Sequence, residues 1–451
     1  MPVVAPPSPA SRSRLGAGDP SALGDALHAF AAELMPLRRC ITGDGLRQTL
    51  LRIGDEVPLR ITEVASGTTV LDWTIPQEWR VKEAYVATAD GERVIDWEDH
   101  PLHLVQYSVP ARDRMPLWAL RSHLHTLPDQ PGLIPYRTSY YTPAWGFCLR
   151  QNDLDQLAER VGESGELEVV VDTELFDGSL TYGEVVVPGE TPSDILLSAH
   201  ACHPGLANDN VSSMAVATAV ARRLLDGPTP RHTVRILFAP GTIGALAWLD
   251  RSHDRLGNVR AGLVLANLGD AGGFTYKRTR AGTLDGPLAV DRAVEVALRD
   301  RGVDVRPFEP TGYDERQFGS PGFDLPVGRL TRTPHGEYPE YHTSGDDLAF
   351  IHPEALAEAV EAVTDVISVL DRDGVYRNLQ PFGEPQLGRR GLYAPMGGAP
   401  DPEAQRALLW VLNLSDGRFS LLDIAERSGL PFATVRTAAD RLVEANLLGA
   451  A

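Results

Sequence analysis

The sequence predicts an α/β protein in which a mostly parallel sheet is sandwiched by helices. Between residues 154 and 373, short apolar runs typical of buried strands alternate with helical patterns. This alternation is typical of a parallel sheet covered on both faces. Residues 55–121 instead alternate apolar and polar positions between turns, which favours a small all-β domain. Residues 403–451 carry three helical patterns that include a helix-turn-helix.

The elements of the α/β part can be placed in order along the chain. Residues 21–54 begin with apolar residues at helical spacing. The predicted strands are residues 195–199, 234–239, 263–268 and 325–330, and the predicted helices are residues 210–225, 243–251, 287–301 and 353–370. Two more strands, residues 167–172 and 182–187, are expected to be able to pair with each other.

We therefore expect four parts in the chain. Residues 1–20 are rich in Pro, Ser and Ala and are predicted to be disordered. Residues 21–54 and 122–382 form the predicted α/β domain, and residues 55–121 are the inserted β-domain. Residues 403–451 are predicted to form a winged-helix-like domain.

Composition excludes some partners and compartments. The 451 residues include 42 basic and 61 acidic side chains, a net charge of −19, so neither nucleic acid nor an anionic membrane is expected as the main partner. The C-terminal helices carry five Arg against seven acids. This balance favours packing or dimerisation over DNA binding, and a homo-oligomer is compatible with it. No apolar run is long enough to cross a bilayer and no signal peptide is visible, which predicts a cytoplasmic protein.

Possible metal ligands follow the predicted strands, where ligands bind in open α/β sheets. His200, His203 and Asp209 follow residues 195–199, and Asp270 follows residues 263–268. His342 lies in a late loop rich in His, Glu and Tyr. Imidazole and carboxylate groups are suited to Zn²⁺, so the sequence predicts a zinc site.

Other interpretations of these residues remain open. Asp209 or Asn208 can serve as a helix N-cap, with the two His as ordinary loop residues, and Asp270 can be an ordinary residue of a Gly-rich turn. Cys202 lies beside two His residues, so a Cys–His nucleophile is conceivable, but it would leave the carboxylates without a role. The adjacent acids Asp314 and Glu315 can hold a general base or form a solvated turn.

Longer strings resemble a known family. SAHACHPGLANDN, PGTIGALAWL, YDERQFGSPGFDLPVG and GEYPEYHTSGDDL are similar to bacterial aminopeptidase-like proteins of the co-catalytic zinc aminopeptidase superfamily. Those proteins carry an inserted small β-domain and a C-terminal winged helix, and the resemblance covers nearly the whole chain. It implies that His200, Asp209, Asp270 and His342 hold one or two zinc ions, with His203 as an extra ligand or a replacement for His200.

The chain departs from that family at two positions. Cys202 stands where the family has an Asp, and Pro240-Gly241 stand where a Glu-Glu pair supplies the general base. A carboxylate from another loop is therefore expected to act as the base. Glu315 is the first candidate, followed by Asp314, Glu340 and Glu337. Arg316 or Tyr341 is expected to hold the oxyanion.

Three functions are compatible with this pattern. The first is a zinc-dependent, aminopeptidase-like hydrolase that acts on a small peptide or aminoacyl-amide with an atypical base. The second is a catalytically altered or inactive metal-binding protein that acts as an interaction or regulatory module. The third is an acyl-transfer enzyme of the glutaminyl-cyclase kind, which needs one zinc ion.

Overall fold

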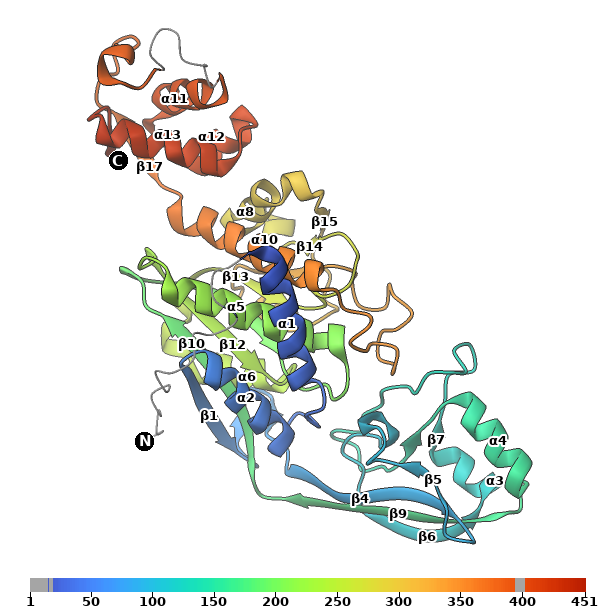
Figure 1. Cartoon of the computed structure of the whole chain (residues 1–451). Helices are drawn as coiled ribbons and strands as arrows, with labels where there is room; N and C mark the ends of the chain where they lie inside the picture. Colours follow the sequence, from blue (N-terminus) through green and yellow to red (C-terminus); the bar gives the residue numbers. More distant parts are fainter. Residues whose placement is uncertain (1–14, 16–18, 394–401) are drawn as a thin grey trace.

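The chain forms three parts that follow one another across the molecule. The computed structural model describes residue 15, residues 19–393 and residues 402–451, so most of the predicted disordered segment 1–20 lies outside the described residues. Figure 1 shows a central α/β domain, a second sheet that extends to one side, and a helical C-terminal domain at the opposite end. None of the helices in the described part of the chain is long and apolar enough to cross a membrane.

The central sheet has eight strands and is parallel in its middle. In spatial order the strands are β1 (Leu59–Ala65), β10 (Ser179–Val187), β12 (His232–Ala239), β11 (Thr191–His200), β13 (Val259–Leu265), β16 (Val327–Thr331), β14 (Thr275–Lys277) and β15 (Asp304–Arg306). Strands β12, β11, β13 and β16 pair in parallel, whereas β1, β10 and β14 pair antiparallel. The parallel strands are almost wholly buried, as expected when helices cover both faces.

Helices cover the two faces of this sheet with separate cores. Along β11, Ile195 and Leu197 join one core with α1 (Pro20–Leu34), α2 (Asp44–Glu56), α5 (Ser213–Asp226), α8 (Ala289–Ala297) and α10 (Pro353–Arg372). Leu196 points the other way into the core that holds α6 (Ile243–Arg251) and α9 (Glu315–Phe318). The short helix α7 (Arg280–Leu284) follows β14. The predicted fold class is confirmed.

The second sheet takes its strands from a wider stretch of chain than predicted. Its order is β5 (Arg93–Asp96), β4 (Glu78–Thr88), β9 (Glu166–Phe176) and β6 (Ala111–Pro116). Strand β9 lies beyond the predicted insertion 55–121, whereas β1 lies inside it and belongs to the central sheet. Short elements complete this region: β2 (Thr69–Val70), β3 (Trp73–Thr74), α3 (Leu117–Leu120), β7 (Leu124–His125), β8 (Phe147–Cys148) and α4 (Gln151–Val161).

The predicted pairing of residues 167–172 with 182–187 is wrong. Strand β9 pairs with β4 and β6, and strand β10 pairs with β1 and β12. Residues 177–178 carry the chain from one sheet into the other, so the two strands share a turn but no ladder.

The C-terminal domain is a winged helix. Its helices are α11 (Pro402–Leu414), α12 (Leu421–Ser428) and α13 (Phe432–Glu444), which confirms the predicted helical patterns. A three-stranded sheet completes it, in the order β18 (Asp416–Ser420), β17 (Val375–Asn378) and β19 (Leu448–Ala450). Strand β17 directly follows α10, so this domain begins before residue 403.

Candidate metal and active site

Four of the predicted metal ligands come from two segments that follow strands of the central sheet. His200 is the last residue of β11, and His203 lies in the loop after it. Asp209 lies in the turn Ala207–Ser212 that precedes α5. His342 belongs to the site loop, residues 332–344, between β16 and α10. Because β11 and β16 run parallel, both segments leave the sheet at the same edge.

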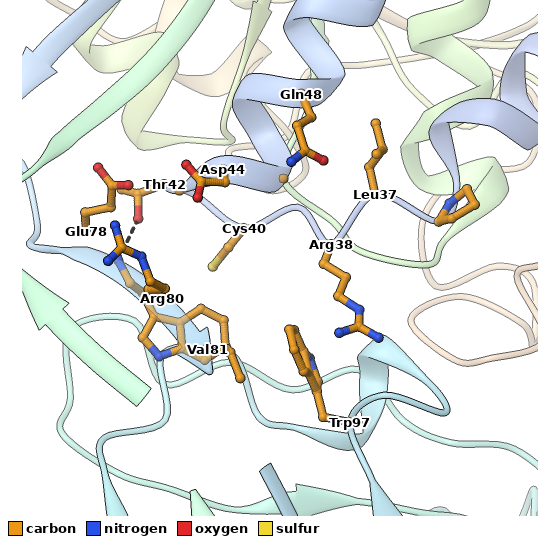
Figure 2. A pocket seen from close by; sticks show the side chains of 14 residues that line it. Leu37, Arg38, Cys40, Thr42, Asp44, Gln48, Glu78, Arg80, Val81 and Trp97 are labelled. Carbon is orange, nitrogen blue, oxygen red and sulfur yellow. Dashed lines mark hydrogen bonds between the residues drawn. The ribbon is translucent and has the colours of Figure 1, made fainter. Parts of the chain in front are cut away.

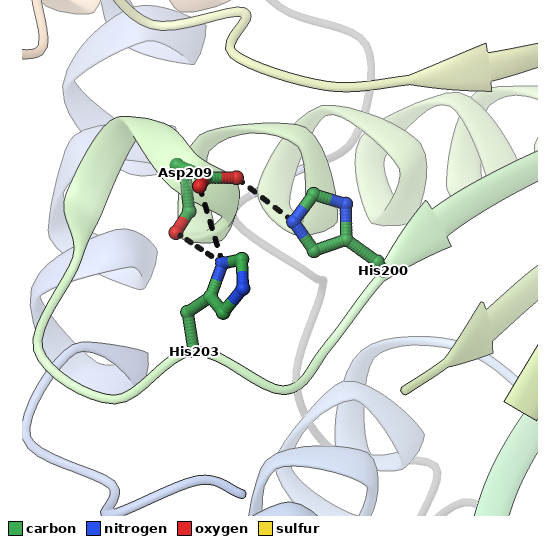
Figure 3. A group of neighbouring side chains, drawn as sticks. All are labelled: His200, His203 and Asp209. Atoms are coloured by element: carbon green, nitrogen blue, oxygen red, sulfur yellow. Dashed lines mark hydrogen bonds and ion pairs between the residues drawn. The ribbon is translucent and has the colours of Figure 1, made fainter. Parts of the chain in front are cut away.

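The carboxylate of Asp209 lies at the centre of three imidazoles. Its Oδ1 is 2.8 Å from His200 Nε2, and its Oδ2 is 3.2 Å from His203 Nδ1 and 3.1 Å from His342 Nε2. Figure 3 shows His200 and His203 approaching Asp209 from two sides. Asp209 is fully buried. The structure thus brings four predicted ligands together.

This cluster fits a bound cation. Asp209 Oδ2 and His342 Nε2 are buried, yet neither makes a hydrogen bond within the described residues. A carboxylate oxygen and an unprotonated imidazole nitrogen are both acceptors, so only a proton or a cation between them makes their approach favourable. His200, His203 and Asp209 also offer three ligand atoms within 4.8 Å of one another. This donor set is one that zinc prefers.

Two of the three imidazoles are held in the neutral form that binds metals, and the third, His203, would have to give up a proton when a cation binds. Burial lowers the pKa of both His200 and His342, which favours the neutral form that binds metals. Burial also disfavours charge on His203 and Asp209, but their mutual attraction outweighs it. The pKa of His203 is therefore well above its usual range and that of Asp209 is well below it.

A carboxylate that was not predicted holds the Asp209 turn. Asp346 accepts hydrogen bonds from the backbone N–H groups of Asn208 (2.5 Å) and Asp209 (2.9 Å) and is fully buried. Asn210 Nδ2 donates to the carbonyl oxygens of His200 and Leu265, both at 3.2 Å. These bonds fix the direction of the Asp209 side chain. The only sequence signal for Asp346 is its place in the string HTSGDD.

Tyrosine rings enclose the imidazoles. The ring of Tyr136 meets those of His203 and His342 edge-on, with centroids 5.1 and 5.0 Å apart, and its backbone N–H donates to the His342 carbonyl oxygen at 2.8 Å. Tyr313 stacks on His200 at 4.8 Å, and Tyr341 stacks on His342 at 4.0 Å. Tyr136 comes from the connector, residues 122–151, so a segment outside the central sheet forms one wall of the site.

Asp314 lies across Gly241 from His200, with its carboxylate free of hydrogen bonds within the described residues. It is 1% exposed, and neither of its oxygens has a hydrogen-bond partner in the described part of the chain. A Cβ atom on Gly241 would be 3.3 Å from His200 Cβ and 3.6 Å from Asp314 Oδ1. Asp314 therefore borders the space that Gly241 leaves open. Burial, followed by repulsion from Glu315, raises the pKa of Asp314 to about 7, a value suited to a general base.

The other predicted acids are placed differently. Glu315 is buried in an ion pair with Lys277 (Oε1 to Nζ, 2.5 Å) and lies 3.4 Å from Arg329 Nη1, so its charge is already compensated. Glu340 is half-buried, and its backbone carbonyl oxygen accepts a hydrogen bond from the Thr343 N–H. Glu337 pairs with Arg306 on the surface. None of these three carboxylates lies in the His cluster.

The structure does not bring Asp270 into the cluster. Its Oδ1 accepts hydrogen bonds from Thr333 Oγ1 (2.6 Å) and from the Gly272 N–H (2.7 Å), and its Oδ2 accepts one from Asn208 Nδ2 (3.0 Å). Through these hydrogen bonds Asp270 connects Asn208, in the Asp209 turn, with Thr333 in the site loop. The physical reason is the Gly-rich turn after β13, which directs this side chain at Asn208 and not at the imidazoles.

A separate cavity lies between the α1–α2 connection and strand β4. It encloses about 300 Å³ and is shown in Figure 2. The charged groups around it are already paired: Glu78 with Arg47 at 2.7 Å and Arg38 with Glu98 at 2.7 Å, while Arg38 also covers the ring of Trp97. It holds no group of metal ligands comparable with the Asp209 cluster.

Comparison with known proteins identifies the family. The family model described as "Domain of unknown function (DUF4910)" matches residues 28–373, more than half of the chain. The chain belongs to the DUF4910 family. A second model, described as a winged helix-turn-helix, matches residues 374–450 of this DUF4910 protein, which agrees with the observed C-terminal domain.

Relatives of the DUF4910 protein match nearly its whole length. A Clostridium acetobutylicum protein named "Putative polysaccharide biosynthesis protein with aminopeptidase-like domain" is 45% identical over 431 residues, which are 95% of this chain and 97% of that protein. The crystal structure of a "putative peptidase" from the same organism has a TM-score of 0.89 at 43% identity and covers 96% of this chain and 97% of its own.

A zinc aminopeptidase shares the fold of the DUF4910 protein. The Bacillus subtilis zinc aminopeptidase has a TM-score of 0.57 at 14% identity and covers 76% of this chain and 94% of its own. Identity this low shows the fold alone. The 45% identical relative, whose name includes an aminopeptidase-like domain, and the winged-helix match confirm the predicted resemblance to bacterial aminopeptidase-like proteins, and their fold is that of the zinc aminopeptidases.

Proposed function

We propose that the protein is a zinc-dependent hydrolase of peptide or amide bonds. One observation carries the proposal: a buried carboxylate, Asp209, faces His200, His203 and His342, with an oxygen and a nitrogen that lack hydrogen-bond partners. Such an arrangement costs free energy unless a proton or a cation lies between these atoms, and with three imidazoles around one carboxylate we propose a cation. The aminopeptidase fold and the name of the Clostridium acetobutylicum relative support this reaction class.

The residues take distinct roles in this reaction. His200, His203, Asp209 and His342 would hold one zinc ion, and such an ion would supply Lewis-acid activation of the scissile carbonyl and of the attacking water. Asp314 accepts the proton of the attacking water and returns it to the leaving amine. Asp314 replaces Glu315 as the preferred base because Glu315 is neutralised by Lys277.

The residues around the cluster indicate which group would bind the oxyanion and which class of substrate would fit. Burial raises the pKa of Tyr341, so its hydroxyl stays protonated and can donate to an oxyanion. Tyr341 is preferred to Arg316, which is exposed. Among the four ligands the His342 side chain is the most exposed, at 33%, so we propose that a small substrate, a short peptide or an aminoacyl-amide, approaches the cluster from its side.

Metal content and turnover test the proposal. The purified protein should hold about one zinc per chain and hydrolyse members of an aminoacyl-amide panel. Asp209→Asn should lose the metal, and Asp314→Asn should keep it but lose about 100-fold or more in kcat. Glu337→Gln, an acid-to-amide change at the surface of the site loop, should alter neither the zinc content nor kcat. A protein that binds no zinc after reconstitution would overturn the proposal, and pyroglutamate formed from N-terminal glutamine would indicate a cyclising enzyme instead.

A further inference from the structure

A histidine outside the metal cluster has a fixed tautomer. Arg329 Nη1 lies 3.2 Å from His335 Nδ1. A guanidinium can only donate, so Nδ1 accepts this hydrogen bond and the proton of the neutral ring is on Nε2. The Nε2–H has no partner among the residues that the structure describes.

The same histidine lies next to the tyrosines that back the metal cluster. Its ring centroid is 5.3 Å from that of Tyr313 and 6.1 Å from that of Tyr341. Those two tyrosines stack on His200 and His342 respectively. His335 is half-buried, so part of its ring is open to solvent beside these two tyrosines.

The charges behind His335 favour an anion in front of it. Arg329 and Lys277 are buried around one carboxylate, Glu315, which leaves an excess of one positive charge. Gly312, at φ +112°, permits this crowding, because a Cβ there would be 2.5 Å from Arg329 Nη1. Protonating His335 would add a third cation beside one anion, so the neutral donor form is favoured.

We propose that His335 donates a hydrogen bond through Nε2–H to a negatively charged oxygen of the substrate, and that Arg329 is the positioning residue that fixes its tautomer. This inference rests on the proposed hydrolase function. The oxygen has two chemical sources: the oxyanion that develops during hydrolysis, or a carboxylate that the substrate carries beside the scissile bond. In both cases a neutral donor backed by excess positive charge is suited to it.

The tautomer can be tested without any turnover. Long-range ¹H–¹⁵N NMR on protein with labelled histidine should show His335 protonated on Nε2. His232 provides a matched internal control, because Arg260 Nη1 lies 2.8 Å from its Nε2, so its proton should be on Nδ1. Arg329→Met should disturb the signal of His335 only, and Arg260→Met that of His232 only. A proton on Nδ1 of His335 in the wild type overturns the inference.

Kinetics separate the two sources of the oxygen. His335→Ala should lower kcat/KM about 10- to 100-fold, and His335→Gln, which keeps a donor, should restore part of it. If the partner is the oxyanion, kcat falls equally for aspartyl- and asparaginyl-amides. If it is a substrate carboxylate, only the aspartyl-amide loses affinity, as a raised KM. Unchanged kinetics for both overturn the inference, whereas absence of turnover in the zinc-loaded wild type overturns the proposed function and leaves the NMR result to decide the tautomer.

Discussion

His342 adopts a backbone conformation that costs free energy. Its φ is +56°, in the left-handed region that a residue with a Cβ avoids by roughly 1–2 kcal/mol. The hydrogen bond from the Tyr136 N–H to its carbonyl oxygen helps to hold it there. We expect metal-free His342→Gly to be more stable than His342→Ala by about 1 kcal/mol, since glycine relieves the strain. Urea unfolding of both apo variants measures this difference, and equal stabilities would contradict the strain.

His232, at the opposite edge of the central sheet, makes stability depend on pH. Burial and then repulsion from Arg260 lower its pKa to about 4, below the value of roughly 6.5 in the unfolded chain. Its stabilisation is therefore complete above pH ~6.5 and is lost as pH falls toward 4. Over this pH range the free energy of unfolding should therefore fall further in the wild type than in His232→Asn, by up to about 3 kcal/mol. Unfolding free energies at several pH values test this, and parallel curves would exclude it.

The chemistry of single residues was easier to predict than their geometry. His200, His203 and Asp209 lie within ten positions, so one strand end was sufficient to predict their proximity. Nothing local indicates that Asp346 would hold the backbone of Asp209, because that contact spans 137 positions. Asp314 and Glu315 look alike in the sequence, yet one is unpaired and the other neutralised by Lys277. That difference depends on strands far apart in the chain.

At the level of elements, local patterns predicted the strands but not their partners. Strands β9 and β10 have the expected apolar runs, and only two residues separate them. A tight connection usually produces a hairpin, but here long-range pairing of β4 with β9 and of β1 with β10 prevails. The strands of the winged helix are short and partly exposed, so they carry little periodicity that could predict them.

The connector and the site loop are joined by two hydrogen bonds between Ile134 and Ser344, one of which uses the Ser344 side chain. Ser344 Oγ accepts a hydrogen bond from the Ile134 N–H at 2.9 Å, and the Ser344 N–H donates to the Ile134 carbonyl oxygen at 2.8 Å. Ser344→Ala removes one of these bonds and leaves a donor unpaired. We expect a loss of about 1 kcal/mol and faster hydrogen exchange at Ile134 and Tyr136. Thr142→Ala, in an exposed part of the connector, should change neither, and unaltered exchange in Ser344→Ala would show that other contacts hold the loops together.

The winged-helix domain packs against the central α/β domain. Arg292 of α8 binds Asp423 and Glu426 of α12, each at 2.6 Å, and buried residues of both domains belong to one hydrophobic cluster. Exposed ion pairs of this kind contribute about 1 kcal/mol or less. The shared apolar core therefore accounts for most of the docking, and the ion pairs determine its orientation.

This docking leaves α13 poorly placed to read DNA. In helix-turn-helix proteins the N-terminal end of the second helix contacts the bases, but here Phe432 and Ala433 line a cavity of about 490 Å³ together with α8 and α10. Arg436 is engaged by Tyr376 and Asp440, and Arg441 by the Leu392 carbonyl oxygen.

We therefore expect no binding of random duplex DNA, even at low salt. With few free cations on α13 there are few phosphates to neutralise, and the net charge of −19 repels the duplex. Fluorescence anisotropy at 20–50 mM salt measures this, with Arg292→Ala included to show that loosening the docking does not create binding. Micromolar affinity that falls steeply with added salt would mean that the winged helix leaves the central domain and exposes a phosphate-binding face.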